Sequence, residues 1–323
     1  MSETASINPT APTGLKVRRI APYLGAEVTG IDLTHPLNQA TVAAIRAAHA
    51  EHEVLVFPNQ KIGSEDLKRF GRYFGDLSVH PFSTNAEDTP ELIVYDNKEG
   101  NPPRATDLWH SDEMFRERPP MGTALCAKIV PELGGDTCFC SMTAAYEALS
   151  DKMQSFLSGL EAINDFKIFK TLFSESEEDQ RRLHEYELLY PKAIHPVVRV
   201  HPITGRKAIY VSRSFTVAIK GLEEIESAML LDRLYRLNSM LEIQYRHRWE
   251  PDMLVFWDNR SVQHAAVHDY YPQRRLMERV TIEGDQPQGT GERAEGTALQ
   301  RFKPGKDIPD SERATRYHDV KRP

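Results

Sequence analysis

Two places in the sequence carry a histidine with a carboxylate two residues further on, which is the smallest pattern that could begin a metal site. They are His110-Ser111-Asp112 and His49-Ala50-Glu51. With 12 histidines and 47 acidic residues among 323, chance alone gives about two such pairs, so local structure has to separate them. His49 and Glu51 fall in an expected helix, where residues two apart point in directions about 200° apart. His110 and Asp112 fall in an expected extended stretch, where residues two apart share a face and can reach one ion.

A metal held by one histidine and one aspartate needs at least one more ligand, and His264 is the best candidate. It lies seven residues after Trp257, just beyond an expected apolar strand. Two imidazoles and one carboxylate on one face of an octahedron suit ferrous iron, and they leave positions open for a cosubstrate and dioxygen. Zinc is disfavoured because the chain contains neither an HExxH nor a CxxC pattern.

The elements that must position these residues are mainly short strands with a few helices between them. Helices are expected over residues 38–52, from a cap at Ser64 onward, and over residues 143–160 and 222–238. The strongly charged residues 175–187 are expected to form a solvated helix or an insertion. Short apolar runs bounded by Gly, Pro and Asp turns predict strands at residues 15–19, 54–57, 92–95, 123–130, 136–140, 194–200, 208–211, 242–249, 253–257 and 275–283. Many short strands without regular helix alternation predict a mainly β fold, a sandwich or barrel with helices around it.

Composition limits the classes of function. Forty basic residues against 47 acidic ones leave a net charge of −7, which gives no basic field for nucleic acid or an anionic membrane. Three cysteines are too few for a disulfide framework. The polar N-terminus lacks the apolar core of a signal peptide, and no apolar run approaches the roughly 20 residues of a membrane span. We therefore expect a soluble, cytoplasmic protein with no nucleic-acid or membrane partner.

Several short motifs follow one another in a recognisable order. They are Asp107-Leu108-Trp109-His110-Ser111-Asp112, Gly134-Gly135-Asp136-Thr137, Trp257-Asp258-Asn259-Arg260 with Gln263-His264, and Pro272-Gln273-Arg274-Arg275 with Arg279. As a set, from about residue 15 to residue 285, they resemble the TauD/TfdA family of Fe(II)- and 2-oxoglutarate-dependent dioxygenases, nearest to taurine dioxygenase. The resemblance implies a double-stranded β-helix (jelly-roll) core and a homo-oligomer, either a dimer or a tetramer. Residues 1–14 are then a flexible arm, residues 15–285 the dioxygenase domain, and residues 286–323 a polar extension.

The resemblance also implies a role for individual residues on the cofactor side. His110, Asp112 and His264 would be the iron ligands. Arg275 would hold the far carboxylate of 2-oxoglutarate, and Thr137 would add a hydroxyl hydrogen bond to it. A guanidinium suits this task because it binds a carboxylate with two parallel hydrogen bonds and stays charged.

On the substrate side, the resemblance places Arg279 against the anionic group of the substrate, with His80 assisting. Arg275 and Arg279 share one face of an expected strand about 13 Å apart along the chain, so they can hold two different anions. Taurine dioxygenases carry Asn where this chain has Thr106, and Tyr near the position of Ser83. Both differences shorten a pocket-lining side chain and remove a hydrogen bond, which favours a bulkier or less polar substrate than taurine.

The expected activity is hydroxylation of a carbon of a small organic anion, most simply a sulfonate, with 2-oxoglutarate and O2 consumed and succinate, CO2 and the heteroatom group released. Alkyl sulfates and aryloxyalkanoates (phenoxy acids) are alternative substrates, because such enzymes would share the core and differ in the lining of the pocket. A non-catalytic jelly-roll binding protein is the alternative from another class. It is disfavoured because every ligand position is filled.

Overall fold

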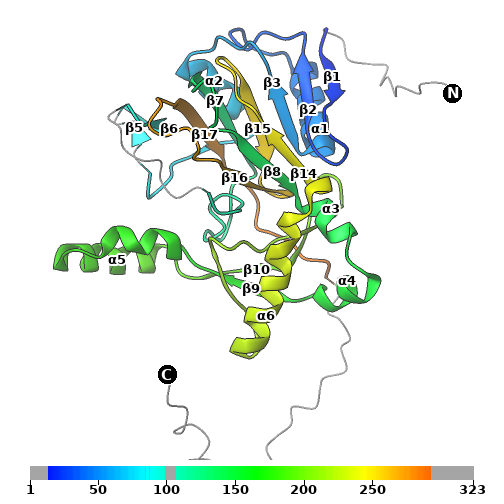
Figure 1. Ribbon diagram of the computed structural model, residues 1–323, viewed down its shortest axis with the longest axis vertical. Coiled ribbons are helices and arrows are strands. Elements are labelled where there is room, and N and C mark those ends of the chain that lie inside the picture. The colour runs from blue at the N-terminus through cyan, green and yellow to red at the C-terminus, as the bar shows by residue number, and fades with distance from the viewer. Residues whose placement is uncertain (1–13, 84, 87, 99–106, 292–323) are drawn as a thin grey trace, which may run out of the picture.

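The computed structural model describes residues 14–83, 85–86, 88–98 and 107–291. Its largest sheet has the strand order β1-β2-β3-β15-β7-β17-β6-β5, with β4 paired to β17 (Figure 1). The strands are β1 (Lys16–Arg19), β2 (Ala26–Thr29), β3 (Val54–Phe57), β4 (Leu77–Ser78), β5 (Asn85–Ala86), β6 (Thr89–Asp96), β7 (Gly122–Ile129), β15 (Leu254–Asp258) and β17 (Leu276–Ile282). Pairing is antiparallel except between β2 and β3. We call this the major sheet.

A second sheet, the minor sheet, faces the major sheet and has the order β14-β8-β16. It consists of β14 (Gln244–His247), β8 (Thr137–Ser141) and β16 (Val262–Ala266), all antiparallel. An antiparallel bridge between His110 and His264 extends it by one further position. Two facing antiparallel sheets confirm the predicted jelly-roll core, mainly β with helices around it.

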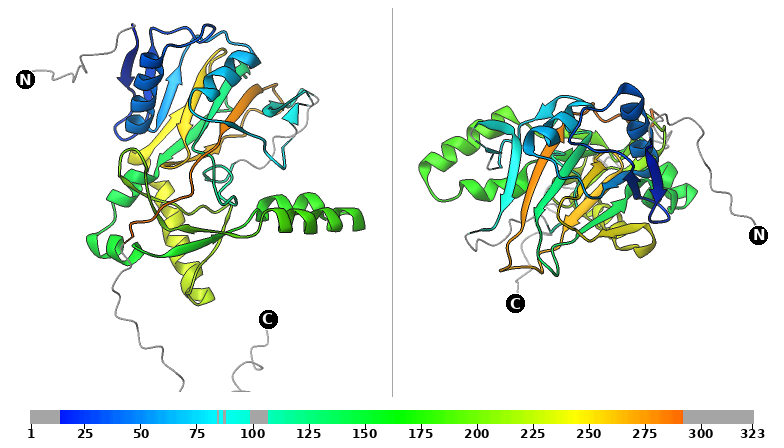
Figure 2. Two further views of the ribbon diagram at one scale, coloured as in Figure 1. Left: turned by 180° about the vertical axis from the view of Figure 1, so that it is seen from behind. Right: turned by 90° about the horizontal axis from the view of Figure 1, so that it is seen from above.

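The alternation of side chains along the strands of the major sheet supplies two separate cores. Val54 and Val56 pack toward the minor sheet with Phe139 of β8. Leu55 and Phe57 point the other way. There they meet α1 (Gln39–His52) and α2 (Ser64–Arg72), which cover the outer face of the sheet (Figure 2, left). The central strands β3 and β15 are therefore buried on both faces, which explains why each is an almost continuous apolar run.

The remaining elements lie beyond the minor sheet, in the lower half of Figure 1. They are α3 (Met142–Glu147), α4 (Asp151–Leu157), β9 (Glu161–Asn164), the 3-10 helix η1 (Lys167–Phe173), α5 (Glu177–Leu189), β10 (Ala193–Pro196), β11 (Val198–Val200), β12 (Lys207–Ile209), β13 (Thr216–Ile219), α6 (Glu224–Tyr235), η2 (Arg236–Ser239) and η3 (Leu241–Ile243). Helix α5 has no buried residue, and it projects away from the rest of the molecule in every view (Figures 1 and 2).

Some predicted elements differ from the observed ones, each for a local reason. The single helix expected over residues 143–160 is two helices, because Ser150 caps a new one by accepting a hydrogen bond from the Met153 amide. The single strand over residues 194–200 is divided at Val197 between β10 and β11, which belong to different sheets. Ser64 is the first residue of α2, and Gly63 occupies the cap position assigned to it. The sequence analysis predicts no strand at the positions of β2, β4, β5, β9, β13 and β16.

Within the described residues, no helix is both long enough and apolar enough to span a bilayer. The predicted boundaries of the arm, the domain and the C-terminal extension stay predictions.

Candidate active site

The three predicted metal ligands lie together where the two sheets meet. Nε2 of His110 and Nε2 of His264 are each 3.8 Å from Oδ1 of Asp112. The potential ligand atoms of all three residues lie within 4.8 Å of one another. His110 and His264 bond to each other through both backbone groups, N to O at 3.0 Å and 2.8 Å. Directly opposed residues of an antiparallel pair project on the same side, so this bridge brings both imidazoles to one place.

The orientation of each donor suits a metal ion. Nδ1 of His110 is 2.7 Å from the carbonyl of Leu108. Because a carbonyl only accepts, Nδ1 carries the proton and the lone pair of Nε2 faces the group. Oδ2 of Asp112 accepts a hydrogen bond from the Thr123 hydroxyl at 2.6 Å, which leaves Oδ1 toward the histidines. Hydrogen bonds behind metal ligands orient them in this way, so one carboxylate oxygen and two imidazole nitrogens face one point.

A buried network fixes the aspartate in turn. The side-chain oxygen of Asn259 accepts from the indole N–H of Trp257 at 3.0 Å and from the backbone N–H of Asp112 at 3.3 Å. The amide nitrogen of Asn259 donates to the Thr123 hydroxyl at 3.0 Å. Asn259 belongs to one of the sequence motifs, but no role was predicted for it. Thr123 was not singled out, because nothing in a strand sequence shows which partner a hydroxyl will find.

The charge states also fit a divalent cation. Burial lowers the pKa of His264 to about 3 and lowers that of His110 as well, so both imidazoles are neutral at neutral pH. Burial alone raises the pKa of Asp112, but the Arg279 guanidinium, aided by the hydrogen bond from Thr123, outweighs it and holds the pKa of the carboxyl below its usual value. Two neutral nitrogen ligands and one carboxylate form a donor set that fits Fe(II).

The predicted 2-oxoglutarate residues lie on either side of Trp249. The indole N–H of Trp249 donates to the Thr137 hydroxyl at 3.0 Å, so the hydroxyl proton is left to donate elsewhere. The guanidinium of Arg275 is 5.9 Å from the Trp249 ring centre and 5.7 Å from that of Tyr270. Among the described residues, the buried Nε of Arg275 has no hydrogen-bond partner. An unpaired buried guanidinium N–H is costly, and an arriving carboxylate would satisfy it.

The glycines of the Gly134-Gly135 motif allow this arrangement. Gly135 has φ +72°, and a Cβ there would lie 3.3 Å from Nε of Arg275. Asn97 holds the backbone of Arg275 in place, because the side-chain oxygen of Asn97 accepts a hydrogen bond from the Arg275 amide at 2.6 Å. Asn97 was not predicted from the sequence.

Arg279 lies deeper along the same strand face, next to the aspartate. Its Nη2 is 2.9 Å from Oδ1 of Asp112, its Nε donates to the Thr281 hydroxyl at 3.1 Å, and its Nη1 donates to the Tyr95 hydroxyl at 3.3 Å. Although burial lowers the pKa of Arg279, the Asp112 carboxylate holds it above its ordinary value. The guanidinium is therefore a fixed positive charge beside the predicted metal ligands.

His80 is brought to the same neighbourhood. It is buried, and its Nδ1 accepts a hydrogen bond from the Phe82 amide at 3.1 Å. Burial, with Arg279 nearby, lowers the pKa of His80 to about 3. Thr106, the third residue assigned to the substrate, lies outside the described residues.

An aromatic cluster borders the site on the side of His80 and His110. Its buried members are Phe82, Met114, Phe115, Phe166, Phe173, Tyr210 and Phe215, with Phe169, Tyr186 and Tyr190 packed against them. The ring of Phe215 is 6.4 Å from that of His110, and the ring of Phe169 is 5.4 Å from that of His80. Sequence reasoning missed this cluster, although the density of aromatic residues between Phe166 and Phe173 was a usable signal.

Comparison with known proteins agrees with this geometry. The family model described as taurine catabolism dioxygenase TauD, TfdA family matches residues 16–281. An alpha-ketoglutarate-dependent sulfonate dioxygenase of Saccharomyces cerevisiae is 35% identical over 290 residues, which are 84% of this chain and 68% of the relative. An alpha-ketoglutarate-dependent sulfate ester dioxygenase of Pseudomonas putida is 32% identical over 287 residues, 87% of this chain and 94% of the relative. The crystal structure of a taurine dioxygenase from Burkholderia xenovorans superposes with a TM-score of 0.72 at 31% identity, covering 86% of this chain and 92% of the other.

The fold and the site define a dioxygenase that depends on 2-oxoglutarate (alpha-ketoglutarate) and consumes O2. The chain belongs to the TauD/TfdA family.

Proposed function

We propose that the protein binds Fe(II) at His110, Asp112 and His264 and hydroxylates a carbon of a small sulfonate or sulfate ester. The observation that carries the proposal is the placement of two arginines along one segment. Arg275 directly precedes β17, the buried Arg279 lies within it, and the three-ligand group lies beside Arg279. One arginine is available to each of two anions, the cosubstrate and the substrate.

The chain's own residues divide the work between the two ends of the site. Arg275 and Thr137 bind and orient the far carboxylate of 2-oxoglutarate. Arg279, steadied by Tyr95 and Thr281, holds the anionic group of the substrate and so fixes which carbon lies near the metal. Bound Fe(II) supplies the oxidation, in which 2-oxoglutarate and O2 yield succinate, CO2 and a hydroxylated carbon.

The anionic group decides what happens after hydroxylation. If the hydroxylated carbon also bears a sulfonate sulfur or a sulfate-ester oxygen, its C–S or C–O bond breaks with loss of the hydroxyl proton. The products are an aldehyde or ketone and sulfite or sulfate.

An aryloxyalkanoate is the second candidate substrate, and the aromatic cluster favours it. Phe169 and Phe215 border the site next to His80 and His110, and such rings pack well against an aryl group. A carboxylate on such a substrate would take the place of the sulfonate at Arg279.

The test is succinate formation by the purified protein with Fe(II), ascorbate and 2-oxoglutarate, across a panel of sulfonates, alkyl sulfates and aryloxyalkanoates. Stimulation by a sulfonate or a sulfate ester, with equimolar sulfite or sulfate, supports the proposal. Stimulation by aryloxyalkanoates alone supports the second candidate and contradicts the first. The expected oligomeric state and cytoplasmic location stay predictions.

A further inference from the structure

A charged pair directly follows the predicted aspartate ligand and has no part in the site described so far. Glu113 comes immediately after Asp112, is 1% exposed, and has φ +48°. Its Oε2 accepts a hydrogen bond from Nε of Arg116 at 2.6 Å, and its backbone carbonyl accepts from the Arg116 amide at 3.0 Å. A buried carboxylate with a short charge-assisted hydrogen bond holds a guanidinium in one orientation.

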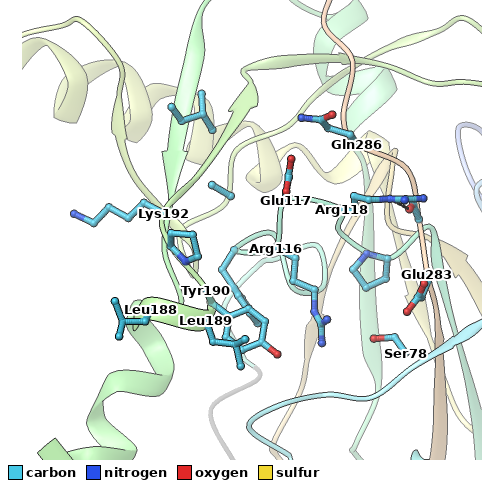
Figure 3. A pocket seen from close by; sticks show the side chains of 16 residues that line it. Ser78, Arg116, Glu117, Arg118, Leu188, Leu189, Tyr190, Lys192, Glu283 and Gln286 are labelled. Atoms are coloured by element: carbon cyan, nitrogen blue, oxygen red, sulfur yellow. Dashed lines mark hydrogen bonds between the residues drawn. The ribbon is translucent and has the colours of Figure 1, made fainter. Parts of the chain in front are cut away.

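Arg116 joins this pair to two other segments. Its Nη2 donates to the carbonyl of Val79 at 2.8 Å. Its guanidinium lies 5.6 Å from the ring centre of Tyr190, the residue that ends α5. Figure 3 shows Arg116 beside Tyr190 in the wall of a pocket of about 830 Å³. The planar fork of one arginine thus contacts the metal-ligand segment, the loop that carries His80, and the end of α5.

The bond to Val79 bears directly on His80. The Val79 carbonyl belongs to the peptide plane that joins Val79 to His80, so a bond that holds this carbonyl also holds the backbone N and Cα of His80. The ring of His80 is then held by the Phe82 amide on one nitrogen and by an edge contact with Phe169. Fixing this peptide plane therefore fixes His80 relative to Arg279.

We propose that Arg116, oriented by Glu113, is a positioning residue that sets the His80 loop against Arg279 and thereby determines the affinity for the anionic group of the substrate. Arg116 acts through Val79 and His80 and is not a catalytic residue. The inference rests on the function proposed above, in which Arg279 and His80 hold that anionic group.

A simpler role for Arg116 makes different predictions. Arg118 and Lys192 line the same pocket, so Arg116 could be one of several positive charges that attract an anion over a distance. In that case a lysine at position 116 would support the same affinity for the anion as arginine does. A positioning role needs the planar guanidinium group, because the ammonium group of lysine cannot reproduce the geometry of its hydrogen bonds to Glu113 and Val79.

The first test reads the loop directly and needs no substrate. The Phe82 amide is hydrogen-bonded to His80, so its hydrogen exchange reports the orientation of that ring. We expect Arg116→Gln and Arg116→Lys each to speed exchange at Phe82 about tenfold, the effect of losing one charged hydrogen bond. Arg118→Gln is the matched control, because Arg118 lies on the same segment but, within the part of the chain that the structure describes, its side chain donates to the Gly284 carbonyl at 3.2 Å and not to Val79. Unchanged exchange at Phe82 in folded Arg116→Lys protein would overturn the proposal.

The second test uses the organic anion that stimulates the wild-type enzyme most strongly. We expect Arg116→Gln to raise the KM for that anion about tenfold, while kcat and the KM for 2-oxoglutarate change by less than about twofold. Lysine at the position should not restore the KM. In a His80→Ala background, Arg116→Gln should have no further effect, since the two residues act in series. Rescue by lysine, or full additivity with His80→Ala, would contradict the positioning role.

The two tests separate the two proposals. If no anion stimulates succinate formation, the proposed function fails, and hydrogen exchange at Phe82 still decides whether Arg116 holds the loop. If the wild-type enzyme turns over an anion while Arg116→Gln raises both KM values equally, the function stands and the positioning role is wrong.

Discussion

The metal-ligand group and the aromatic cluster border the same site but are held in different ways. His110 and His264 are joined through two backbone hydrogen bonds, and Asp112 is tied to Thr123 and Asn259. The aromatic cluster is drawn from the loop around Phe82, from η1, from the end of α5 and from the segment that ends at Phe215, all outside the two facing sheets. Met114 and Phe115 join it from the turn that begins at Asp112, so this turn links the two regions.

The difference follows from what each region has to do. A metal site tolerates little displacement of its ligands, and backbone pairing between strands supplies that precision. A substrate pocket has to suit one molecule among many similar ones, and connecting segments can change without disturbing the sheets. The residues that carry out the reaction are thus held by the paired strands, whereas the residues that select the substrate lie on the segments that connect those strands. Four predictions test how firmly the strands hold the reactive site.

The largest effect is expected from removing a predicted ligand. Asp112→Ala should lower succinate formation by at least about a thousandfold, because the remaining imidazoles leave a metal without its anionic ligand. The melting temperature should also fall, because the buried guanidinium of Arg279, which lies 2.9 Å from Oδ1 of Asp112, loses its charge partner. Substantial turnover by the purified variant would show that the metal is bound elsewhere.

The next effect tests the 2-oxoglutarate end. Arg275→Gln removes a charged hydrogen-bond donor and should raise the KM for 2-oxoglutarate by about thirtyfold, which corresponds to roughly 2 kcal/mol. Arg274→Gln is the matched control, because Arg274 is exposed, points the other way and pairs with Asp96 at 2.9 Å. Equal effects of the two substitutions on that KM would exclude Arg275 as a specific ligand.

A smaller effect tests the hydrogen-bond network behind the ligands. Thr123→Val keeps the shape of the side chain but leaves Oδ2 of Asp112 and the amide nitrogen of Asn259 unpaired. Metal affinity, measured by titration calorimetry, should fall about tenfold, as it does when an outer partner of a metal ligand is removed. Thr204→Val is the control for exchanging threonine for valine, because Thr204 is exposed in the turn between β11 and β12. It should leave the metal affinity unchanged. An unchanged affinity would mean that the network does not orient Asp112.

The smallest effect concerns the scaffold alone. Burial lowers the pKa of His49, His195 and His247 each to about 4, against about 6.5 in an unfolded chain. Between these values the unfolded chain binds more protons, so stability is complete above about pH 6.5 and falls as the pH drops toward 4. At about pH 5.5 the loss is roughly 1 kcal/mol per histidine. Glu53 opposes part of this loss, because burial raises its pKa to about 7 and its protonation stabilises the folded chain as the pH falls. The melting temperature should therefore fall by only a few degrees from about pH 7.5 to about pH 5.5, and a rise would contradict these pKa directions.

Much of this division could be predicted from the sequence, and the limits are informative. The ligands could be found because His110 and Asp112 are two residues apart and because their motif resembles a known family. The extended stretch expected for them is only partly correct, since His110 forms a strand bridge but Asp112 begins a turn. Arg275 and Arg279 could be placed on one face because a strand alternates strictly. These inferences depend on local periodicity, which a sequence displays directly.

The missed residues depend on contacts between distant segments. Thr123 and Asn259 are 136 positions apart along the chain, and Asn97 and Arg275 are 178 apart. Nothing in either local stretch shows that such residues will meet. The break at Val197 also depends on tertiary structure, because its amide donates to Leu160 instead of continuing one strand.

The most direct test of the central claim is an anaerobic titration of Fe(II) into the purified protein, followed by 2-oxoglutarate. The account predicts one Fe(II) per chain and one 2-oxoglutarate bound after it. Fe(II) binding should be lost in Asp112→Ala and kept in Arg275→Gln, which should lose only the tight binding of 2-oxoglutarate. Stoichiometric Fe(II) binding that survives Asp112→Ala would contradict the account.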